Sequence, residues 1–307
     1  MSGDTPSWTE RTLSFGSTRN LVGIHCLPRT VHATSPVVLF LNSGLVHRVG
    51  PNRLYVRLAR RFATAGIGSI RFDLSGIGDS ISDPGASASV LEQVKGDIAT
   101  AIDLAEKNGA TGVVLLGICS GADNGFAAAV RDPRVVGAVL IDPNAYPTWG
   151  FYLHYIGKRM RRLRTWLNLV AGPHSIPRRI AALFRRKSPE QQGAANVFLA
   201  PTTLPPRETM REQLLQLIAR ETRLLYIFTG GLQWRYNHKR QLFRAFPDID
   251  WRSLAQLEYY SASDHTFSRA EHQQLLIDRV CDWLQSTQFR TAPATSASPP
   301  AEEVLVF

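Results

Sequence analysis

The chain has 307 residues, 44% hydrophobic and 20% charged, which suits one large core and is too short for two enzyme domains of ordinary size. Its three cysteines lack the paired spacing of a disulfide framework or a zinc site. No apolar run approaches the ~20 residues that span a bilayer, and residues 1–10 carry no apolar signal core. We therefore expect a cytoplasmic protein with no metal and no bound cofactor.

Strands and helices are predicted to alternate through the first half of the chain. Residues 8–27 favour an antiparallel hairpin, because apolar residues alternate there around a turn. Further along, apolar runs and helical spacing predict strands at 37–41, 67–72, 113–116 and 135–141, and helices at 53–65, 90–108 and 121–130. This order predicts an α/β protein with a mostly parallel, eight-stranded sheet and helices on both faces.

The alternation stops near residue 145 and resumes near residue 222. The interval is basic, aromatic and broken by prolines, and it contains no clear strand. Strands at 224–228 and 257–260 and helices at 238–246 and 269–284 follow it. Insertions of this kind usually cover an active site. The predicted domains are a core of residues 8–144 and 222–288, a helical lid of residues 145–221 and a flexible tail of residues 289–307.

The net charge of +10 is concentrated in the predicted lid. Residues 151–189 contain ten Lys or Arg and no Asp or Glu. One interpretation is a solvated helical face. The other is a basic surface that attracts an anionic substrate, a carrier or, by peripheral contact, a membrane. Nucleic acid is not expected, because no recognised binding motif accompanies the charge.

The segment that follows the predicted strand at 113–116 has the pattern of a nucleophile elbow. Gly117, Cys119 and Gly121 alternate with other residues at the junction between a buried strand and a helix of small residues. Small neighbours permit the strained turn, and the helix N-terminus favours a thiolate. Cys119 is therefore the predicted nucleophile, although it could instead be a small buried hydrophobe, and Ser120 is the alternative nucleophile.

A general base is expected after the last strand. His265 lies there, in a polar loop before the last helix, where it can take a proton from Cys119. The orienting acid is less clear, because the loop after the strand at 224–228 contains no carboxylate. Asp142, at the end of the preceding strand, either orients His265 or only caps a turn. A thiolate–imidazolium pair depends less on that acid than a serine does.

Two backbone amides are predicted to form the oxyanion hole. They are those of Ser120, after the nucleophile, and of Leu45, in the loop after the strand at 37–41. The candidate substrate-binding residues are the polar pair of that loop and three aromatic residues of the lid: His47, Arg48, Tyr146, Trp149 and Tyr152. The polar pair could instead hold the loop to the lid, and aromatic residues at helical spacing are more often part of a simple core.

Over residues 10–288 these motifs resemble the α/β-hydrolase superfamily. Within it, four blocks resemble hydrolases associated with bacterial exosortase and exopolysaccharide loci and with natural-product gene clusters: residues 48–50, 71–80, 117–122 and 264–267. The chain departs from the usual pattern in two ways. Cys119 replaces the usual serine, as in dienelactone hydrolases, and the loop that usually supplies the acid contains no Asp or Glu.

Three functions fit this sequence. The first is hydrolysis or transfer of an acyl group from an ester or thioester, as in a thioesterase or acyltransferase, on an anionic or carrier-linked substrate. Cys119 would attack, His265 would shuttle the proton, and the Leu45 and Ser120 amides would hold the oxyanion. The second is elimination with His265 as the base. The third is an inactive scaffold that binds a polyanion or a membrane.

Overall fold

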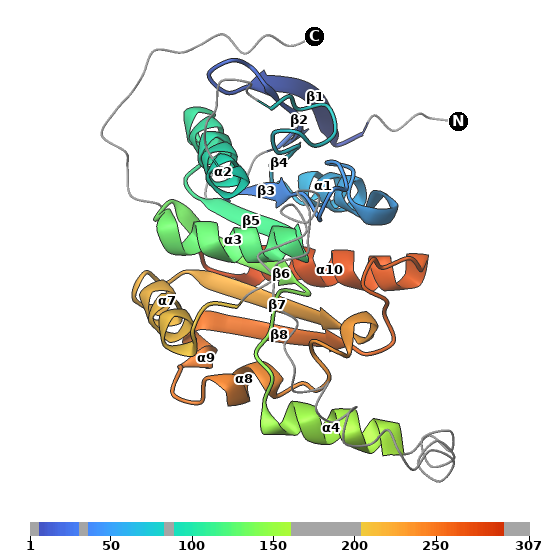
Figure 1. Cartoon of the computed structure of the whole chain (residues 1–307). Helices are drawn as coiled ribbons and strands as arrows, with labels where there is room; N and C mark the ends of the chain where they lie inside the picture. Colours follow the sequence, from blue (N-terminus) through green and yellow to red (C-terminus); the bar gives the residue numbers. More distant parts are fainter. Residues whose placement is uncertain (1–5, 31–35, 83–88, 161–203, 292–307) are drawn as a thin grey trace.

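The structure, a computed structural model (Figure 1), describes residues 6–30, 36–82, 89–160 and 204–291, without the side chains of residues 158–160. Three predictions from the sequence fall wholly or partly outside these ranges. They are the central part of the lid, most of the basic segment 151–189, and the tail from residue 292 onward.

The described chain forms one eight-stranded sheet. Its strands are β1 (Trp8–Phe15), β2 (Leu21–Pro28), β3 (Val37–Leu41), β4 (Ser69–Phe72), β5 (Val113–Ile118), β6 (Val135–Ile141), β7 (Arg223–Thr229) and β8 (Ala255–Tyr260). Their order across the sheet is β1-β2-β4-β3-β5-β6-β7-β8. The β1–β2 and β2–β4 pairs are antiparallel, and all the others are parallel. The expected α/β fold with a mostly parallel sheet of eight strands is thus confirmed.

Helices cover both faces of this sheet (Figure 1). They are α1 (Leu54–Thr64), α2 (Val90–Lys107), α3 (Ser120–Arg131), α4 (Trp149–Met160), α7 (Arg207–Ala219), α8 (Gln241–Ala245), α9 (Trp251–Leu254) and α10 (Ala270–Ser286), with short 3-10 turns η1 (Pro51–Arg53) and η3 (Gly230–Leu232). Among the described helices, none is long and apolar enough to cross a membrane.

The alternation of side chains along each strand divides the core into two layers. In β3, Leu39 and Leu41 face the layer that contains α2 and α3, whereas Val38 and Phe40 face the layer that contains α1 and α10. Successive side chains of a strand point to opposite faces, so a continuous apolar run is required when both faces are covered.

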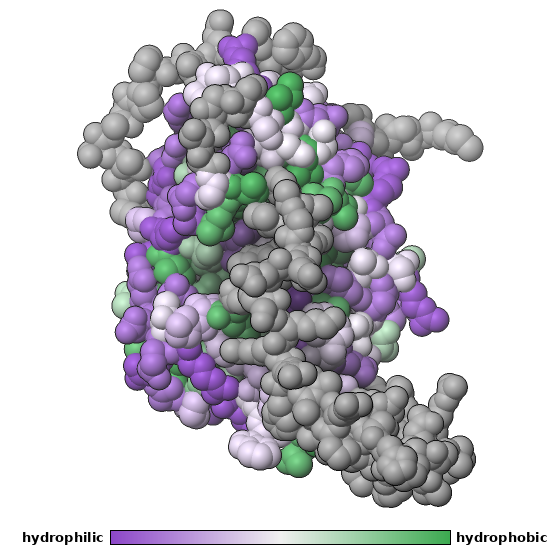
Figure 2. Space-filling view, in the orientation of Figure 1, coloured by the Kyte–Doolittle hydropathy of each residue, from purple (hydrophilic) through white to green (hydrophobic). Residues whose placement is uncertain are grey.

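The surface shown in Figure 2 carries hydrophobic residues in separate places among hydrophilic ones.

Two local predictions needed correction. The helix expected at 238–246 is only α8, because the side chain of Gln241 holds the preceding residues in a turn, accepting from the Asn237 amide at 3.1 Å and donating to the Arg235 carbonyl at 2.8 Å. The short helix α9 was not predicted, because a single turn leaves no helical period to detect. The other predicted strands and helices of the core have boundaries within two residues of those observed.

Candidate active site

The turn between β5 and α3 holds Cys119 in a strained conformation. Its φ and ψ angles are 56° and −118°, a region that L-residues rarely adopt. The flanking glycines make the turn possible: a Cβ on Gly117 would lie 2.2 Å from the backbone of Gly121, and one on Gly121 would lie 2.6 Å from the carbonyl oxygen of Asn42. The turn therefore requires both glycines, as the sequence pattern indicates.

His265 and Asp142 meet Cys119 at the carboxyl end of the sheet. The Nδ1–H group of His265 donates to Oδ2 of Asp142 at 2.8 Å, and the imidazole lies close enough to the Cys119 thiol for the two groups to shift each other's pKa. Asp142 follows β6 directly and is buried, whereas the His265 side chain is 26% exposed. The chain order Cys, Asp, His and this line of contacts are those of a catalytic triad.

The acid of this triad comes from β6, and β7 supplies its support. Thr229, the last residue of β7, donates to Asp142 through its amide at 2.7 Å and through its hydroxyl at 2.6 Å. Together with His265, these groups give the buried carboxyl three donors. Asp142 therefore both orients the imidazole and has its own hydrogen-bonding capacity satisfied. Sequence analysis missed Thr229, although its place directly after a buried strand was a usable signal.

The protonation of the pair favours a thiolate and an imidazolium. Burial alone would lower the pKa of His265, but its hydrogen bonds to Asp142 and Cys119 outweigh burial and raise the pKa to about 9. The hydrogen bond from His265 lowers the pKa of Cys119 against the opposing effect of burial, and the charge of Arg235 and the Ser120 amide lower it further. A sulfur in this state is a strong nucleophile.

The other two cysteines have a different environment. Cys26 and Cys281 are fully buried in the core. Burial raises the pKa of Cys26 to about 12 and also raises that of Cys281. Of the three cysteines, Cys119 is thus the one whose thiol pKa is lowered, whereas Cys26 and Cys281 are buried packing groups.

The loop after β3 approaches the nucleophile through Ser120. The hydroxyl oxygen of Ser120 accepts from the Gly44 amide at 2.8 Å, and the side chain is 2% exposed. The hydroxyl is therefore engaged in holding the loop, which argues against Ser120 as the nucleophile. In the described part of the chain, the Leu45 amide has no hydrogen-bond acceptor, so it remains available to an oxyanion.

A buried carboxyl anchors the same loop from below. Asp73, 0% exposed, accepts from the Asn42 side chain at 3.1 Å and from the Arg48 amide at 2.6 Å, and it pairs with the Arg48 guanidinium. Arg48 also pairs with Asp79 at 2.6 Å. Arg48, which sequence analysis offered as a substrate-binding residue, thus joins two loops in this structure. Its neighbour His47 is exposed.

The aromatic candidates lie away from the triad's hydrogen bonds. Tyr146 is buried, and its hydroxyl donates to the Pro205 carbonyl at 2.6 Å, so it packs as a core residue. Trp149 and Tyr152, on α4, are 84% and 50% exposed. Among the described residues, no hydrogen bond or ring contact joins them to Cys119 or His265. Their proposed role in substrate binding rests on the sequence alone.

A residue that the sequence reading passed over lies beside the triad. Arg235 follows η3, and its Nη1 lies 3.5 Å from the carbonyl oxygen of Asp142. Its charge helps to lower the pKa of Cys119, and it partly offsets the burial that raises the pKa of Asp123 to about 6. The sequence analysis considered only the absence of a carboxylate from this loop, because no local pattern marks the cation.

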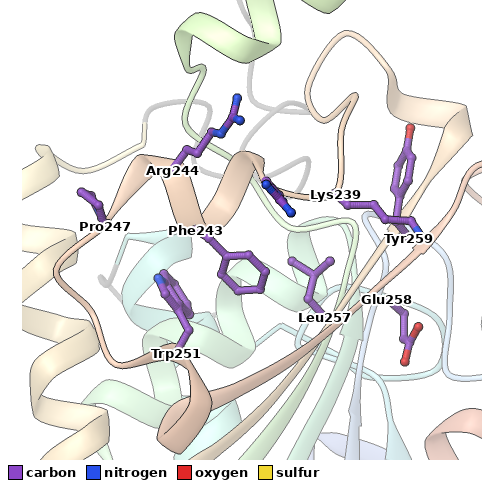
Figure 3. A pocket seen from close by; sticks show the side chains of 9 residues that line it. Lys239, Phe243, Arg244, Pro247, Trp251, Leu257, Glu258 and Tyr259 are labelled. Carbon is purple, nitrogen blue, oxygen red and sulfur yellow. The ribbon is translucent and has the colours of Figure 1, made fainter.

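A separate pocket of about 610 Å³ lies between α8 and the outer strand β8 (Figure 3). It is lined by Lys239, Arg240, Phe243, Arg244, Pro247, Trp251, Leu257, Glu258 and Tyr259. Figure 3 shows Phe243 and Leu257 facing each other, with Trp251 beside Phe243. No triad residue lines this pocket, so it is distinct from the site around Cys119. Among the described residues, no cluster of three or more His, Cys, Asp or Glu could hold a metal ion.

Comparison with known proteins agrees with this architecture. The model of the family described as serine aminopeptidase, S33, matches residues 38–217, more than half of the chain. A search of curated proteins found no match. The solved structures that resemble the chain share its fold at low sequence identity.

Three of these structures illustrate the similarity. Est1E from Butyrivibrio proteoclasticus has a TM-score of 0.54 at 12% identity, over 90% of this chain and 98% of its own. The hypothetical protein PA2218 from Pseudomonas aeruginosa has a TM-score of 0.56 at 14% identity, over 92% and 94%. A proline iminopeptidase from Mycobacterium smegmatis has a TM-score of 0.51 at 16% identity, over 90% and 98%.

Proposed function

We propose that this chain, which belongs to the serine aminopeptidase S33 family and has the α/β-hydrolase fold, is a hydrolase or acyltransferase that acts on an ester or thioester through Cys119. The observation that carries the proposal is the continuous contact from Cys119 through His265 to Asp142. The family is named for a serine, so the cysteine is the feature that most needs a test.

The geometry supports the following sequence of steps. The Cys119 thiolate attacks the carbonyl carbon and forms an S–C bond, while the carbonyl oxygen becomes an oxyanion held by the Leu45 and Ser120 amides. His265 then gives its proton to the departing alcohol or thiol as the C–O or C–S bond breaks. Asp142 keeps the imidazole oriented throughout by accepting from Nδ1–H at 2.8 Å.

The second half of the reaction releases the acyl group. Water, or the hydroxyl, thiol or amine of another acceptor, loses a proton to His265 and attacks the thioester carbon. The S–C bond breaks and Cys119 leaves as a thiolate beside the renewed imidazolium. Because a thiolate is a better leaving group than an alkoxide, this acyl-enzyme is readily attacked by water or by another acceptor. The acceptor decides between hydrolysis and transfer.

The test is mass spectrometry of the intact protein after exposure to activated acyl esters and thioesters. We expect an acyl adduct on Cys119 that is lost in Cys119→Ala, is slowed in His265→Ala and is retained in Cys281→Ala, the control for labelling elsewhere. The mass of the released product identifies the acceptor. An adduct that persists in Cys119→Ala, or a Cys119 that reacts with no acyl donor between pH 6 and 9, would overturn the proposal.

A further inference from the structure

The guanidinium of Arg235 is held next to the nucleophile by a rigid segment of backbone. The Arg235 amide donates to the Leu232 carbonyl at 2.8 Å, and its own carbonyl accepts from the fully buried side chain of Gln241 at 2.8 Å. The next residue, Tyr236, is 1% exposed and stacks on Phe228 of β7 with ring centroids 3.6 Å apart. The position of Arg235 is thus fixed by the core.

The side chain of Arg235 is also oriented. Its guanidinium carbon lies 4.8 Å from the centre of the Trp234 ring, a cation–π contact that holds the planar group from one side. Nη1 lies 3.5 Å from the Asp142 carbonyl, at the limit of a hydrogen bond. A partly buried cation that is held in place by the protein is prepared for a ligand.

Arg235 lacks an acidic partner among the residues that the structure describes. In the described part of the chain, no carboxyl oxygen lies within 4.0 Å of its guanidinium nitrogens. Burial raises the pKa of the nearby Asp123 to about 6, an effect that the charge of Arg235 only partly offsets, and the oxygens of Asp123 accept from the amide and side chain of Asn144 at 2.9 and 2.7 Å. Other site cations differ, since Arg48 pairs with two carboxyls. With respect to the described residues, Arg235 therefore retains free donors close to the backbone of Asp142.

We propose that Arg235 binds a carboxylate of the acyl substrate, a few bonds from the carbonyl that Cys119 attacks. This inference rests on the proposed function and narrows its substrate class to acyl donors that carry their own anionic group. A planar guanidinium offers paired N–H groups in the geometry of a carboxylate, and a partly buried site weakens the competition from water. The subsite lies on the loop that follows β7.

The first experiment uses two small alkylating agents that differ in charge. Iodoacetate and iodoacetamide both form an S–C bond with the Cys119 thiolate and release iodide, but only iodoacetate carries a carboxylate. We expect the ratio of their rates, iodoacetate over iodoacetamide, to fall about tenfold in Arg235→Gln, which corresponds to the loss of one charge-assisted contact. Arg235→Lys should keep most of the ratio, because the charge remains.

The control is Arg240→Gln, which removes the same charge from the separate pocket beside β8. Its ratio should equal that of the unmodified protein. An unchanged ratio in Arg235→Gln, or an equal fall in Arg240→Gln, would overturn the inference, since the preference would then come from His265 or from the net charge alone.

The second experiment compares succinyl and butyryl thioesters of N-acetylcysteamine as acyl donors. We expect the succinyl donor to have the lower KM, with the difference lost in Arg235→Gln through KM rather than kcat. Equal KM values for both donors in the unmodified protein would overturn the inference and leave the proposed function intact. Absence of any acyl adduct, alongside a ratio of alkylation rates that depends on Arg235, would instead contradict the proposed function.

Discussion

Replacing His265 with Gln removes the main cause of thiolate formation at Cys119. A pKa raised from 6.5 to about 9 corresponds to about 3 kcal/mol of net preference for the imidazolium, at ~1.4 kcal/mol per pH unit. Because burial opposes the imidazolium, the favourable interactions of His265 with Asp142 and Cys119 must together be larger than this net value. The coupling between two titrating groups is reciprocal, so the interaction that raises the pKa of His265 also lowers the pKa of the Cys119 thiol.

The consequence is a large loss of reactivity at neutral pH. In His265→Gln only burial and weaker effects act on Cys119, so its pKa should return to its ordinary value of 9.0 or higher. A thiol with that pKa is about 1% ionised at pH 7. We expect the alkylation of Cys119 by iodoacetamide to slow by roughly 10- to 100-fold at pH 7. The pH at which the alkylation rate reaches half of its maximum should move to about 9.

The assay is the rate of alkylation from pH 5 to 10, followed by intact mass. His154→Gln, on the exposed helix α4, is the control and should match the unmodified protein. Acyl transfer should also decline above about pH 9 in the unmodified protein, because His265 then loses the proton that the leaving group needs. If the profile of His265→Gln coincided with that of the unmodified protein, the reasoning from coupled protonation would be refuted.

Three further substitutions test the supports of the site. Thr229→Val should slow acylation severalfold and cost about 1 kcal/mol in a urea melt, because Asp142 loses a hydroxyl donor at 2.6 Å; an unaltered rate would show that the amide suffices. Gly121→Ala should lower the free energy of unfolding by more than ~2 kcal/mol, since its Cβ would lie 2.6 Å from a backbone oxygen, and an unchanged melt would contradict the tight turn. Asp73→Ala should cost roughly 3 kcal/mol because it leaves the Arg48 guanidinium unpaired, and a loss below 1 kcal/mol would indicate that solvent replaces the carboxylate.

Local patterns predicted most of the fold. Runs such as 37–41 and 135–141 became β3 and β6 with the expected boundaries, because a strand covered on both faces must be apolar throughout. The short helices α8 and α9 were predicted poorly. The start of α8 depends on contacts with distant residues, such as the carbonyl of Tyr146 that accepts from Gln241 at 3.1 Å, and the single turn of α9 has no helical period.

The candidate site was predictable only where one segment specifies it. The elbow at Cys119 is local, so its glycines and its place after a strand were readable. The sequence left open whether Asp142 orients His265 or only caps a turn, because the contact between them joins residues 123 positions apart. No sequence pattern marks Arg235. Its interest comes from the absence of a carboxyl partner among the described residues, which the sequence alone does not display.

The position of the triad acid has a consequence for which amines this site tolerates. With the acid on β6, the loop after β7 carries a guanidinium where a carboxylate would otherwise be usual. The substrate of an aminopeptidase brings a terminal ammonium close to the cleaved bond, and two like charges near a partly buried site repel each other. On the proposed role of Arg235, we therefore expect this arrangement, with Asp142 behind the histidine, to disfavour peptides with a free amino terminus, although the family is described by its aminopeptidases.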